Sequence, residues 1–330
     1  MEMPVLGIIL GDASGIGPEI VCKMLNLKKT GRSFKPIIIG SEKVFKSGMK
    51  YSGVLEYKRY SDIRDIHESS NLDEIVLYDN NKFEPGELGT MDKQSGNSFI
   101  EMIKASIELA NNHIIDAIVY APINKKLINI ANNCYTDELQ VFKHLLNYNE
   151  FCIEMNYSGN LWTSRVTGHI PLMQVSSYLN INRIVNIIKL TNQSLKLMGI
   201  SDPLLYVSAI NPHGGEGGLF GTEEDDIIIP AVAQAKSEGI NVKGPFPADT
   251  IFYRAFSGEC NAVITMYHDQ GQIALKTKCF DGGVTLLAGL PLTVLTTGHG
   301  VGYNIAGKGI ASYNSMLNAV NIAIKMTRNN

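Results

Sequence analysis

Short runs of β-branched and other apolar residues alternate along this chain with longer segments of helical periodicity. Helical periodicity is clearest over Asn182–Met198, where isoleucine and leucine recur about every 3.6 residues, and Ser98–Asn111 and Tyr313–Arg328 follow the same rhythm. The strand-like runs are Val5–Leu10, Pro36–Ile39, Glu74–Tyr78, Ala117–Tyr120, Phe151–Tyr157, Leu204–Ser208, Ala262–Met266 and Val284–Leu287. Strands separated by helices of this length form βαβ units, so the sequence predicts an α/β protein with a mainly parallel sheet.

The length of the chain, 330 residues, is too great for one ordinary hydrophobic core. We therefore expect two domains. Because no low-complexity linker divides the sequence, we expect the chain to cross between the domains more than once. Ligands of such folds sit beyond the carboxyl ends of the strands, so candidate chemistry is expected at the strand ends that face a central cleft.

Composition excludes several classes of function. The hydrophobic content of 45% and charged content of 18% are typical of a globular protein, and no apolar run is long enough for a transmembrane helix. The first residues contain no basic region of a secretory signal. A net charge of −3 argues against a nucleic-acid-binding surface. The 5 cysteines are scattered and form no CxxC pair, which favours reduced thiols in a cytoplasmic protein and excludes a structural zinc site built on cysteines.

The histidines fall into two populations. His67, His113 and His144 lie in polar or helix-like text, where a solvated or capping role is the better interpretation. His169, His213, His268 and His299 lie beside glycines or prolines near strand ends. Three imidazoles from strand ends, with carboxylates such as Asp249 and Asp269 nearby, are typical of a catalytic divalent metal site with an open position. The alternative is that each histidine merely caps a turn.

The glycine-rich segments have alternative interpretations as well. GDASGIGPE carries Gly11, Gly15 and Gly17 but is neither a GxGxxG nor a Walker loop. Its Pro18 and Glu19 are typical of the first turn of a helix. The segment HGVGYNIAGKGIA is either a loop around an adenosine or a surface turn.

The segment NPHGGEGGLFGTEEDD carries no basic residue and closes on four acidic ones. This composition argues against a phosphate cradle. We interpret it as a strand end that delivers His213, followed by a turn in which Thr222 caps a helix beginning near Glu223.

Taken together, GDASGIGPE, APINK, GHIPL, NPHGGEGGLFGTEE, GPFPADTIF, MYHDQGQIALK and HGVGYNIAGKG resemble the motifs of the 4-hydroxythreonine-4-phosphate dehydrogenase family of pyridoxine (vitamin B6) biosynthesis and its paralogues. The resemblance covers essentially the whole chain. It implies a two-domain isocitrate/isopropylmalate dehydrogenase-like fold with a central cleft. The first α/β domain would comprise residues 1–128 plus 297–330. The second, 129–296, would carry most metal and substrate residues and the dimer interface.

The same resemblance implies roles for individual residues. The metal ligands fall on His169, His213 and His268, with the third ligand supplied by the partner subunit of a homodimer. Substrate and proton-transfer roles fall on Tyr135, Thr136, Asp249, Asp269, Lys276 and Thr285. The cofactor residues are Gly11, Gly15, Ile16, Gly17, His299, Gly300, Asn304, Ala306, Gly307 and Lys308.

The implied chemistry is oxidation of a hydroxy acid related to 4-phosphohydroxy-L-threonine, with hydride passing to NAD or NADP and decarboxylation following. A divalent ion (zinc, magnesium, manganese or cobalt) would lower the pKa of the substrate hydroxyl. Lys276 or a nearby aspartate would relay protons.

The departures from the family pattern concern the substrate. Tyr135 stands where the GHTE motif has histidine, Thr285 where asparagine is expected, and Gly298 where aspartate precedes His299. Val294 replaces an arginine, and valine cannot bind phosphate as a guanidinium does. We hypothesise a paralogue with a different hydroxy acid, including one without the terminal phosphate. The competing account is that Lys126, Lys276 or Lys278 supplies the missing charge.

Two further classes of protein remain as alternatives. A phosphate acyltransferase of the same architecture would not need a three-histidine metal site. A non-catalytic binding paralogue would be compatible with the altered substrate residues, although erosion of His169, His213 or His268 would then also be expected.

Overall fold

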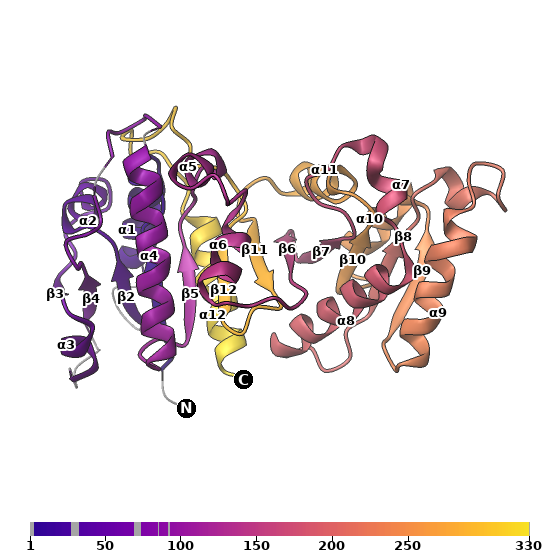
Figure 1. The fold of residues 1–330 in the computed structure, drawn as a ribbon, viewed down its shortest axis with the longest axis horizontal. Helices are drawn as coiled ribbons and strands as arrows, with labels where there is room; N and C mark the ends of the chain where they lie inside the picture. Colours follow the sequence, from indigo (N-terminus) through magenta and orange to yellow (C-terminus); the bar gives the residue numbers. More distant parts are fainter. Residues whose placement is uncertain (1–2, 28–32, 69–73, 85, 92, 330) are drawn as a thin grey trace. The chain divides into compact units, whose positions relative to one another are not determined.

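The computed structural model describes residues 3–27, 33–68, 74–84, 86–91 and 93–329. The chain folds into two compact units, each an α/β layer structure (Figure 1). The first unit comprises Met1–Asn149 and Leu290–Arg328, and the second comprises Glu150–Gly289. The chain therefore leaves the first unit, builds the second, and returns.

The first unit is built on a parallel sheet with the strand order β3-β4-β2-β1-β5-β12. Its strands are β1 (Val5–Ile9), β2 (Lys35–Ile39), β3 (Tyr57–Tyr60), β4 (Ile75–Tyr78), β5 (Ala117–Tyr120) and β12 (Thr293–Thr297). Their side chains are almost entirely buried on β1, β2, β4 and β5. Continuous burial of this kind is expected where helices cover both faces of a parallel sheet.

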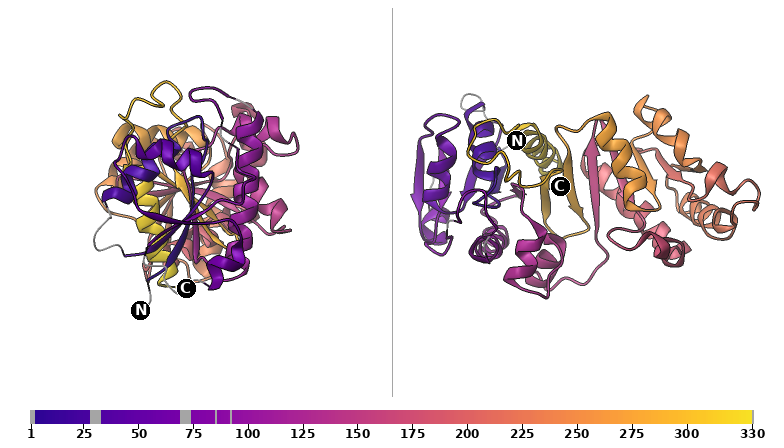
Figure 2. Two further views of the ribbon diagram at one scale, coloured as in Figure 1. Left: turned by 90° about the vertical axis from the view of Figure 1, so that its left-hand side faces the viewer. Right: turned by 90° about the horizontal axis from the view of Figure 1, so that it is seen from above.

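Helices flank this sheet on both faces (Figure 2). α1 (Gly17–Leu27) contacts α2 (Glu42–Met49) and α12 (Asn314–Thr327), whereas α4 (Lys93–Asn111) contacts α5 (Lys125–Ala131) and α6 (Glu138–Leu145). A short helix, α3 (Ile63–Glu68), follows β3. The strand β1 connects through α1 to β2 on one side, and β5 lies on its other side, so the connections diverge between β1 and β5. This topological switch point is where open α/β sheets bind ligands.

The second unit has a mixed sheet with the order β11-β6-β7-β10-β8-β9. Its strands are β6 (Ile153–Ser158), β7 (Leu161–Arg165), β8 (Leu205–Ser208), β9 (Val242–Phe246), β10 (Ala262–Thr265) and β11 (Val284–Ala288). β6 runs antiparallel to both β7 and β11, and the remaining pairs are parallel. Because β7 and β10 are parallel neighbours, their carboxyl ends lie at the same edge of the sheet.

Two layers of helices also cover the second sheet (Figure 2). α8 (Ile181–Leu197) contacts α9 (Ile229–Ser237), and α10 (Ala248–Phe256) and α11 (His268–Lys278) contact strands β6, β7, β8 and β10. The short α7 (Val175–Tyr178) follows the loop after β7. The core under α10 and α11 contains Ile251, Val263 and Leu275.

The predicted α/β class with a mainly parallel sheet is confirmed, as are the strand-like runs and the three helices named from periodicity. The sequence analysis missed β3, β7, β9 and β12. Pro18 and Glu19 do lie in the first turn of α1. Among the described residues, no helix is both long and apolar enough to cross a membrane.

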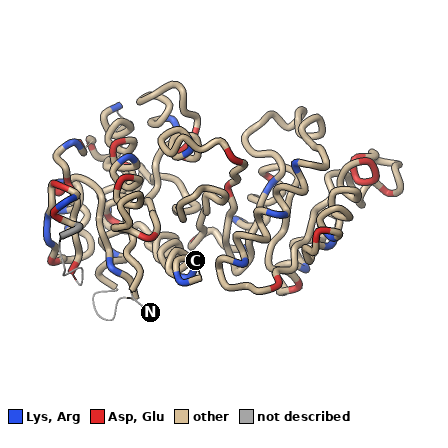
Figure 3. Tube along the Cα trace, turned by 60° about the horizontal axis from the view of Figure 1, so that its bottom comes forward, with Lys and Arg blue, Asp and Glu red and all other residues tan. Residues whose placement is uncertain are grey.

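Basic and acidic residues are interspersed along the described trace (Figure 3). The cysteines are free, and all of them lie within the described residues. Burial raises the pKa of the Cys22 and Cys260 thiols to about 12, so both stay protonated at neutral pH.

Candidate active site

His169 and His268 lie close together in the second unit. β7 and β10 are parallel neighbours, with Arg165 opposite Thr265 in the register. Beyond the strands, Val166 N donates to Thr265 O at 2.8 Å and Thr167 N donates to Met266 O at 3.1 Å, so the two segments continue side by side. The ring centroids of His169 and His268 are 5.2 Å apart. Two adjacent strand ends thus deliver two imidazoles to one place.

The orientation of the His268 ring is fixed by the next residue. Nδ1 of His268 and Oδ1 of Asp269 are 2.6 Å apart. A carboxylate at Nδ1 leaves Nε2 as the nitrogen available to a metal or a substrate, as in carboxylate–histidine–metal arrangements. About one third of the His268 side chain is exposed. The Asp269 carboxylate thus contacts a candidate metal ligand, and its predicted catalytic role beside the metal remains a prediction.

His213 lies in a short 3₁₀ turn, Pro212–Gly215, with a left-handed backbone at φ 54°. This conformation is uncommon for a residue with a Cβ atom. Its ring contacts Phe220, with centroids 6.4 Å apart. No group of three or more His, Cys, Asp or Glu side chains that could hold a metal is found among the described residues of one chain. Within one chain, two of the three predicted histidine ligands, His169 and His268, therefore lie close together.

Glu224 holds the His213 turn in place, a role the sequence analysis missed. The carboxylate is 2% exposed, and Oε1 accepts from the backbone N–H groups of Ile210 and Asn211, each at 2.8 Å. Glu224 begins a π-helical turn, Glu224–Ile228, that precedes α9, and the residue before it makes no side-chain cap. The predicted start of this helix near Glu223 is confirmed, since Glu223 is helical and Asp226 N donates to Thr222 O at 2.8 Å. A side-chain cap by Thr222 stays a prediction. Nothing in the run of four acidic residues distinguishes Glu224 as the one that is buried.

Asp249 and Lys276 lie on the surface of the second unit. Asp249 is exposed in the first turn of α10, and Lys276 is exposed in the last turn of α11. Lys276 follows His268 by eight residues on the same helix, so the two lie about 12 Å apart along the helix axis and about 80° apart around it. Their predicted proton-transfer roles remain predictions.

Tyr135 and Thr136 precede α6 in the first unit. Tyr135 is 6% exposed and packs edge-on against His144, with ring centroids 5.5 Å apart. Thr136 N donates to Gln140 Oε1 at 3.0 Å, and Asp137 caps α6 by accepting from Gln140 N at 2.9 Å. The Tyr135 ring is therefore buried against its neighbours.

His144, predicted to be solvated or capping, contacts the Tyr135 ring. The side chain of His67, which has the same prediction, lies outside the described residues.

The two predicted cofactor segments meet in the first unit, at the switch point of its sheet. Ile16 N donates to Val301 O at 2.9 Å, which joins the turn after β1 to the segment after β12. The hydroxyl of Tyr303 donates to Oδ2 of Asp12 at 2.5 Å, and Asp12 is wholly buried. A Cβ at Gly15 would lie 2.7 Å from Val301 O, so the close approach of the two backbones requires glycine there.

A second contact ties the later part of the glycine-rich segment to α1. Nζ of Lys23 binds Oε1 of Glu19 at 2.7 Å and donates to the carbonyls of Gly309 and Ala311, both at 2.9 Å. Ala311 N also donates to Oε1 of Glu19, which is 3% exposed. The stretch containing Asn304, Ala306, Gly307 and Lys308 is thus held between two anchored ends.

Position 294, where the family pattern has arginine, is in the core of the first unit. Val294 is 0% exposed and lies opposite Ile118 in the β12–β5 register. The three candidate replacement cations, Lys126, Lys276 and Lys278, are all exposed, and Nζ of Lys278 lies 5.6 Å from the centroid of the Phe256 ring. The Val294 side chain therefore packs in the hydrophobic core of the first unit.

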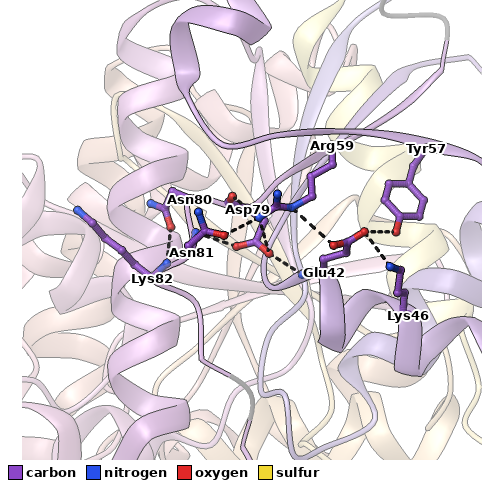
Figure 4. Close-up of polar contacts among 8 residues, drawn as sticks. All are labelled: Glu42, Lys46, Tyr57, Arg59, Asp79, Asn80, Asn81 and Lys82. Carbon is purple, nitrogen blue, oxygen red and sulfur yellow. Dashed lines mark hydrogen bonds and ion pairs between the residues drawn. The ribbon is translucent and has the colours of Figure 1, made fainter.

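A separate polar cluster joins α2, β3 and the segment that follows β4 (Figure 4). Glu42 accepts from the hydroxyl of Tyr57 at 2.7 Å and pairs with Lys46 at 2.9 Å. Asp79 accepts from the backbone N–H of Glu42 at 2.8 Å and lies 3.6 Å from Arg59. These groups satisfy one another, and the cluster connects α2 to β3 and to the end of β4.

Comparisons with known proteins place the chain among relatives over nearly its full length. The family model for the pyridoxal phosphate biosynthetic protein PdxA matches residues 32–323. A Rhizobium meliloti protein provisionally named 4-hydroxythreonine-4-phosphate dehydrogenase 2 is 38% identical, and the match covers 98% of this chain and 94% of the relative. An Oceanobacillus iheyensis protein provisionally named D-threonate 4-phosphate dehydrogenase is 37% identical, with 98% of each chain covered.

The fold has a close counterpart among solved structures. A crystal structure of 4-hydroxythreonine-4-phosphate dehydrogenase from Klebsiella pneumoniae matches with a TM-score of 0.81 and 30% sequence identity. The match covers 98% of this chain and 99% of that chain.

Proposed function

Since the chain belongs to the PdxA family of pyridoxal phosphate biosynthetic proteins and is a dehydrogenase of that family, we propose that it oxidises a hydroxy acid related to 4-phosphohydroxy-L-threonine with a divalent metal and NAD or NADP. We propose that decarboxylation follows. The observation that carries the proposal is the pairing of the His169 and His268 rings, 5.2 Å apart at adjacent strand ends. Imidazoles at this spacing, one oriented by a carboxylate, are suited to a shared ion.

The metal would be held by His169, His268 and His213, and the donor chemistry of three imidazoles fits zinc, cobalt or another divalent transition ion, with magnesium and manganese as further candidates. When bound, such an ion lowers the pKa of a coordinated hydroxyl and polarises a neighbouring carbonyl. Asp269 holds Nδ1 of His268, which keeps Nε2 directed to the site. In the proposal, Lys276 and Asp249 exchange protons with the substrate through Nζ and the carboxylate.

The dinucleotide would bind where the two glycine-rich segments of the first unit meet. The bond from Ile16 N to Val301 O and the bond from Tyr303 to Asp12 support this assignment, because they bring Gly11–Gly17 and His299–Lys308 to the switch point of the sheet.

We also propose a homodimer with a shared active site, in which a second copy supplies the remaining metal ligand. Large apolar side chains are exposed on the segments that carry the histidines and on α10. They are Leu172, Met173, Leu219, Phe220, Tyr253, Ile273 and Phe280, with Met173 94% and Tyr253 83% exposed. An apolar set of this size on one unit is typical of a surface that another protein covers, and identical subunits are the commonest partners.

For the substrate, two classes follow from the buried Val294. Because a valine within the sheet offers no charge, the acid either lacks the terminal phosphate or has its phosphate bound elsewhere. The relative provisionally named D-threonate 4-phosphate dehydrogenase makes D-threonate 4-phosphate a further candidate.

The test is a screen of NADH and NADPH formation with 4-phosphohydroxy-L-threonine, D-threonate 4-phosphate and D-threonate, with each divalent metal. We expect turnover of at least one acid, loss of turnover on chelation, and loss of both turnover and metal binding in His213→Ala. A His113→Ala variant is the matched control, since His113 lies outside the site. Normal activity of His213→Ala would refute the metal assignment. Acyl transfer without metal would instead support the acyltransferase alternative.

A further inference from the structure

A hydrogen-bonded row crosses the sheet of the second unit beside the candidate metal site. Asn156 on β6 lies directly opposite Thr285 on β11 and opposite Thr163 on β7. Directly opposed residues point their side chains to the same face of a sheet. Gly271 of α11 lies against Thr163 and Thr265, so this is the face that α11 covers. Asn156 is therefore enclosed between the sheet and the helix that begins at His268.

The amide of Asn156 is oriented by two donors. Its Oδ1 accepts from an Nη atom of Arg165 at 2.6 Å and from Nε2 of Gln272 at 2.7 Å. With the oxygen occupied in this way, the Nδ2 group is directed to Thr285, where it donates to Oγ1 at 2.9 Å. Only 9% of Asn156 is exposed, so its orientation is set by these protein groups.

The direction of these hydrogen bonds determines which role remains open to the Thr285 hydroxyl. A hydroxyl that accepts through Oγ1 still has its own hydrogen to donate. The hydrogen-bond chain behind it ends on the guanidinium of Arg165, whose side chain is 11% exposed and pairs with Glu154. A hydrogen-bond chain that starts on a cation polarises each successive donor, and in a dry environment the effect is larger than in water. The Thr285 hydroxyl is thus prepared to donate to an anionic oxygen.

The row is also joined to the metal site through the chain. Arg165 ends β7 four residues before His169, and Gln272 follows His268 by one turn of α11. A displacement of Asn156 would release Gln272 and Thr285 together. Asn156 therefore supports both Gln272, on the helix that carries His268, and Thr285.

We propose that Arg165 and Asn156 are positioning residues that set the specificity of the site: through Asn156, Arg165 makes Thr285 a polarised donor to an anionic oxygen, carboxylate or phosphate, of the substrate. The inference rests on the proposed function for the role of Thr285 as a substrate contact. It supplies a source of positive polarisation that does not depend on position 294. It also differs from the account in which an exposed lysine replaces the missing arginine.

The test measures the binding of 4-phosphohydroxy-L-threonine, D-threonate 4-phosphate and D-threonate by calorimetry, with metal and NADH present so that no oxidation occurs, and the kinetics with whichever acid is turned over. In Thr285→Val the donor is lost while shape is kept. In Asn156→Asp the amide donor becomes an acceptor that draws the Thr285 hydrogen away from the substrate. Each is expected to weaken acid binding about tenfold, the typical effect of one hydrogen bond to a charged group. The KM for NAD is expected to stay unchanged.

The double variant separates a relay from two independent effects. Thr285→Val with Asn156→Asp should bind the acid as weakly as Thr285→Val alone, because Asn156 acts through Thr285. Thr285→Ser should rescue binding. Arg165→Met should weaken acid binding, and Arg165→Lys should restore part of it. Thr163→Val is the matched control, since it removes a hydroxyl from the same row on the other side of Asn156.

The outcomes are distinguishable from those of the proposed function. If the wild-type protein binds one of the three acids but oxidises none, the proposed function fails while the variant affinities still decide this inference. Wild-type affinity in Thr285→Val, or additive losses in the double variant, would overturn it. A wild-type protein that binds none of the three acids would overturn it as well.

Discussion

The hydroxyl of Tyr303 donates a 2.5 Å hydrogen bond to the buried carboxylate of Asp12, and so links the segment that follows β12 to the turn that follows β1. Asp12 also accepts from Ser14 N at 2.9 Å. The two partners lie 291 residues apart in the sequence, and they meet where the dinucleotide is proposed to bind.

Replacing Tyr303 by phenylalanine should weaken dinucleotide binding, because the two glycine-rich segments lose a charged-group hydrogen bond of about 1.5–3 kcal/mol. We expect the KM for NAD to rise about tenfold or more while kcat changes less. Steady-state kinetics and calorimetric titration with NAD measure the effect. Tyr313→Phe, in the same unit, is the control, and equal NAD affinities in the two variants would contradict the prediction.

A shared active site predicts complementation between inactive subunits. His213→Ala and His268→Ala should each be inactive alone. If these two ligands come from different subunits, random mixing after joint refolding restores one intact site in half of the dimers, giving about a quarter of wild-type activity. The assay is NAD reduction after refolding the two variants together and separately. No gain on mixing would place both ligands in one subunit.

Breaking the Glu19–Lys23 pair should destabilise the first unit. Removing the ammonium leaves a buried carboxylate with only the Ala311 N–H, so Lys23→Met is expected to cost about 3–5 kcal/mol of unfolding free energy. Urea denaturation measures it. Lys46→Met, which removes an exposed partner of Glu42, should cost about 1 kcal/mol or less. Similar losses in the two variants would show that burial of Glu19 does not matter.

Acid should weaken the cluster around Glu42. The Tyr57 hydroxyl and the Lys46 ammonium hold the pKa of Glu42 below its usual 4.5. A lowered pKa in the folded state contributes stability that is fully present above 4.5 and lost as the pH falls through the lowered value. Glu42→Gln should therefore reduce the melting temperature near neutral pH, and the difference from wild type should shrink as the pH is lowered below 4.5. A difference between variant and wild type that grows in acid would have the wrong sign.

Much of the fold could be predicted because buried parallel strands such as Val5–Ile9 have an unmistakable apolar sequence. The missed strands lack that signal. β3 is YKRY on a sheet edge, β7 is LWTSR with polar residues facing α8 and α11, and β9 contains Gly244 and Pro245. Their strand conformation depends on neighbours that are distant in the sequence.

The candidate site was predictable to a similar degree. The glycine and proline around His169 and the apolar run before His268 marked two strand ends that the structure does bring together. Nothing in the sequence marked Arg165, Asn156 or Glu224, because a buried ion or amide is recognised by its partners, and those come from other elements. Local sequence can nominate a ligand but cannot show what orients it.

The discontinuous first unit imposes an order on folding during synthesis. β12 and α12 leave the ribosome after the whole of the second unit, yet β12 pairs with β5 and α12 packs on both strands. Until they emerge, β5 presents an unpaired edge of the kind that invites wrong partners. The second unit can fold as soon as it is made, whereas the first must wait for β12 and α12. The proposed dinucleotide site therefore becomes complete only when these two elements have emerged, long after the glycine-rich turn that follows β1 has been synthesised.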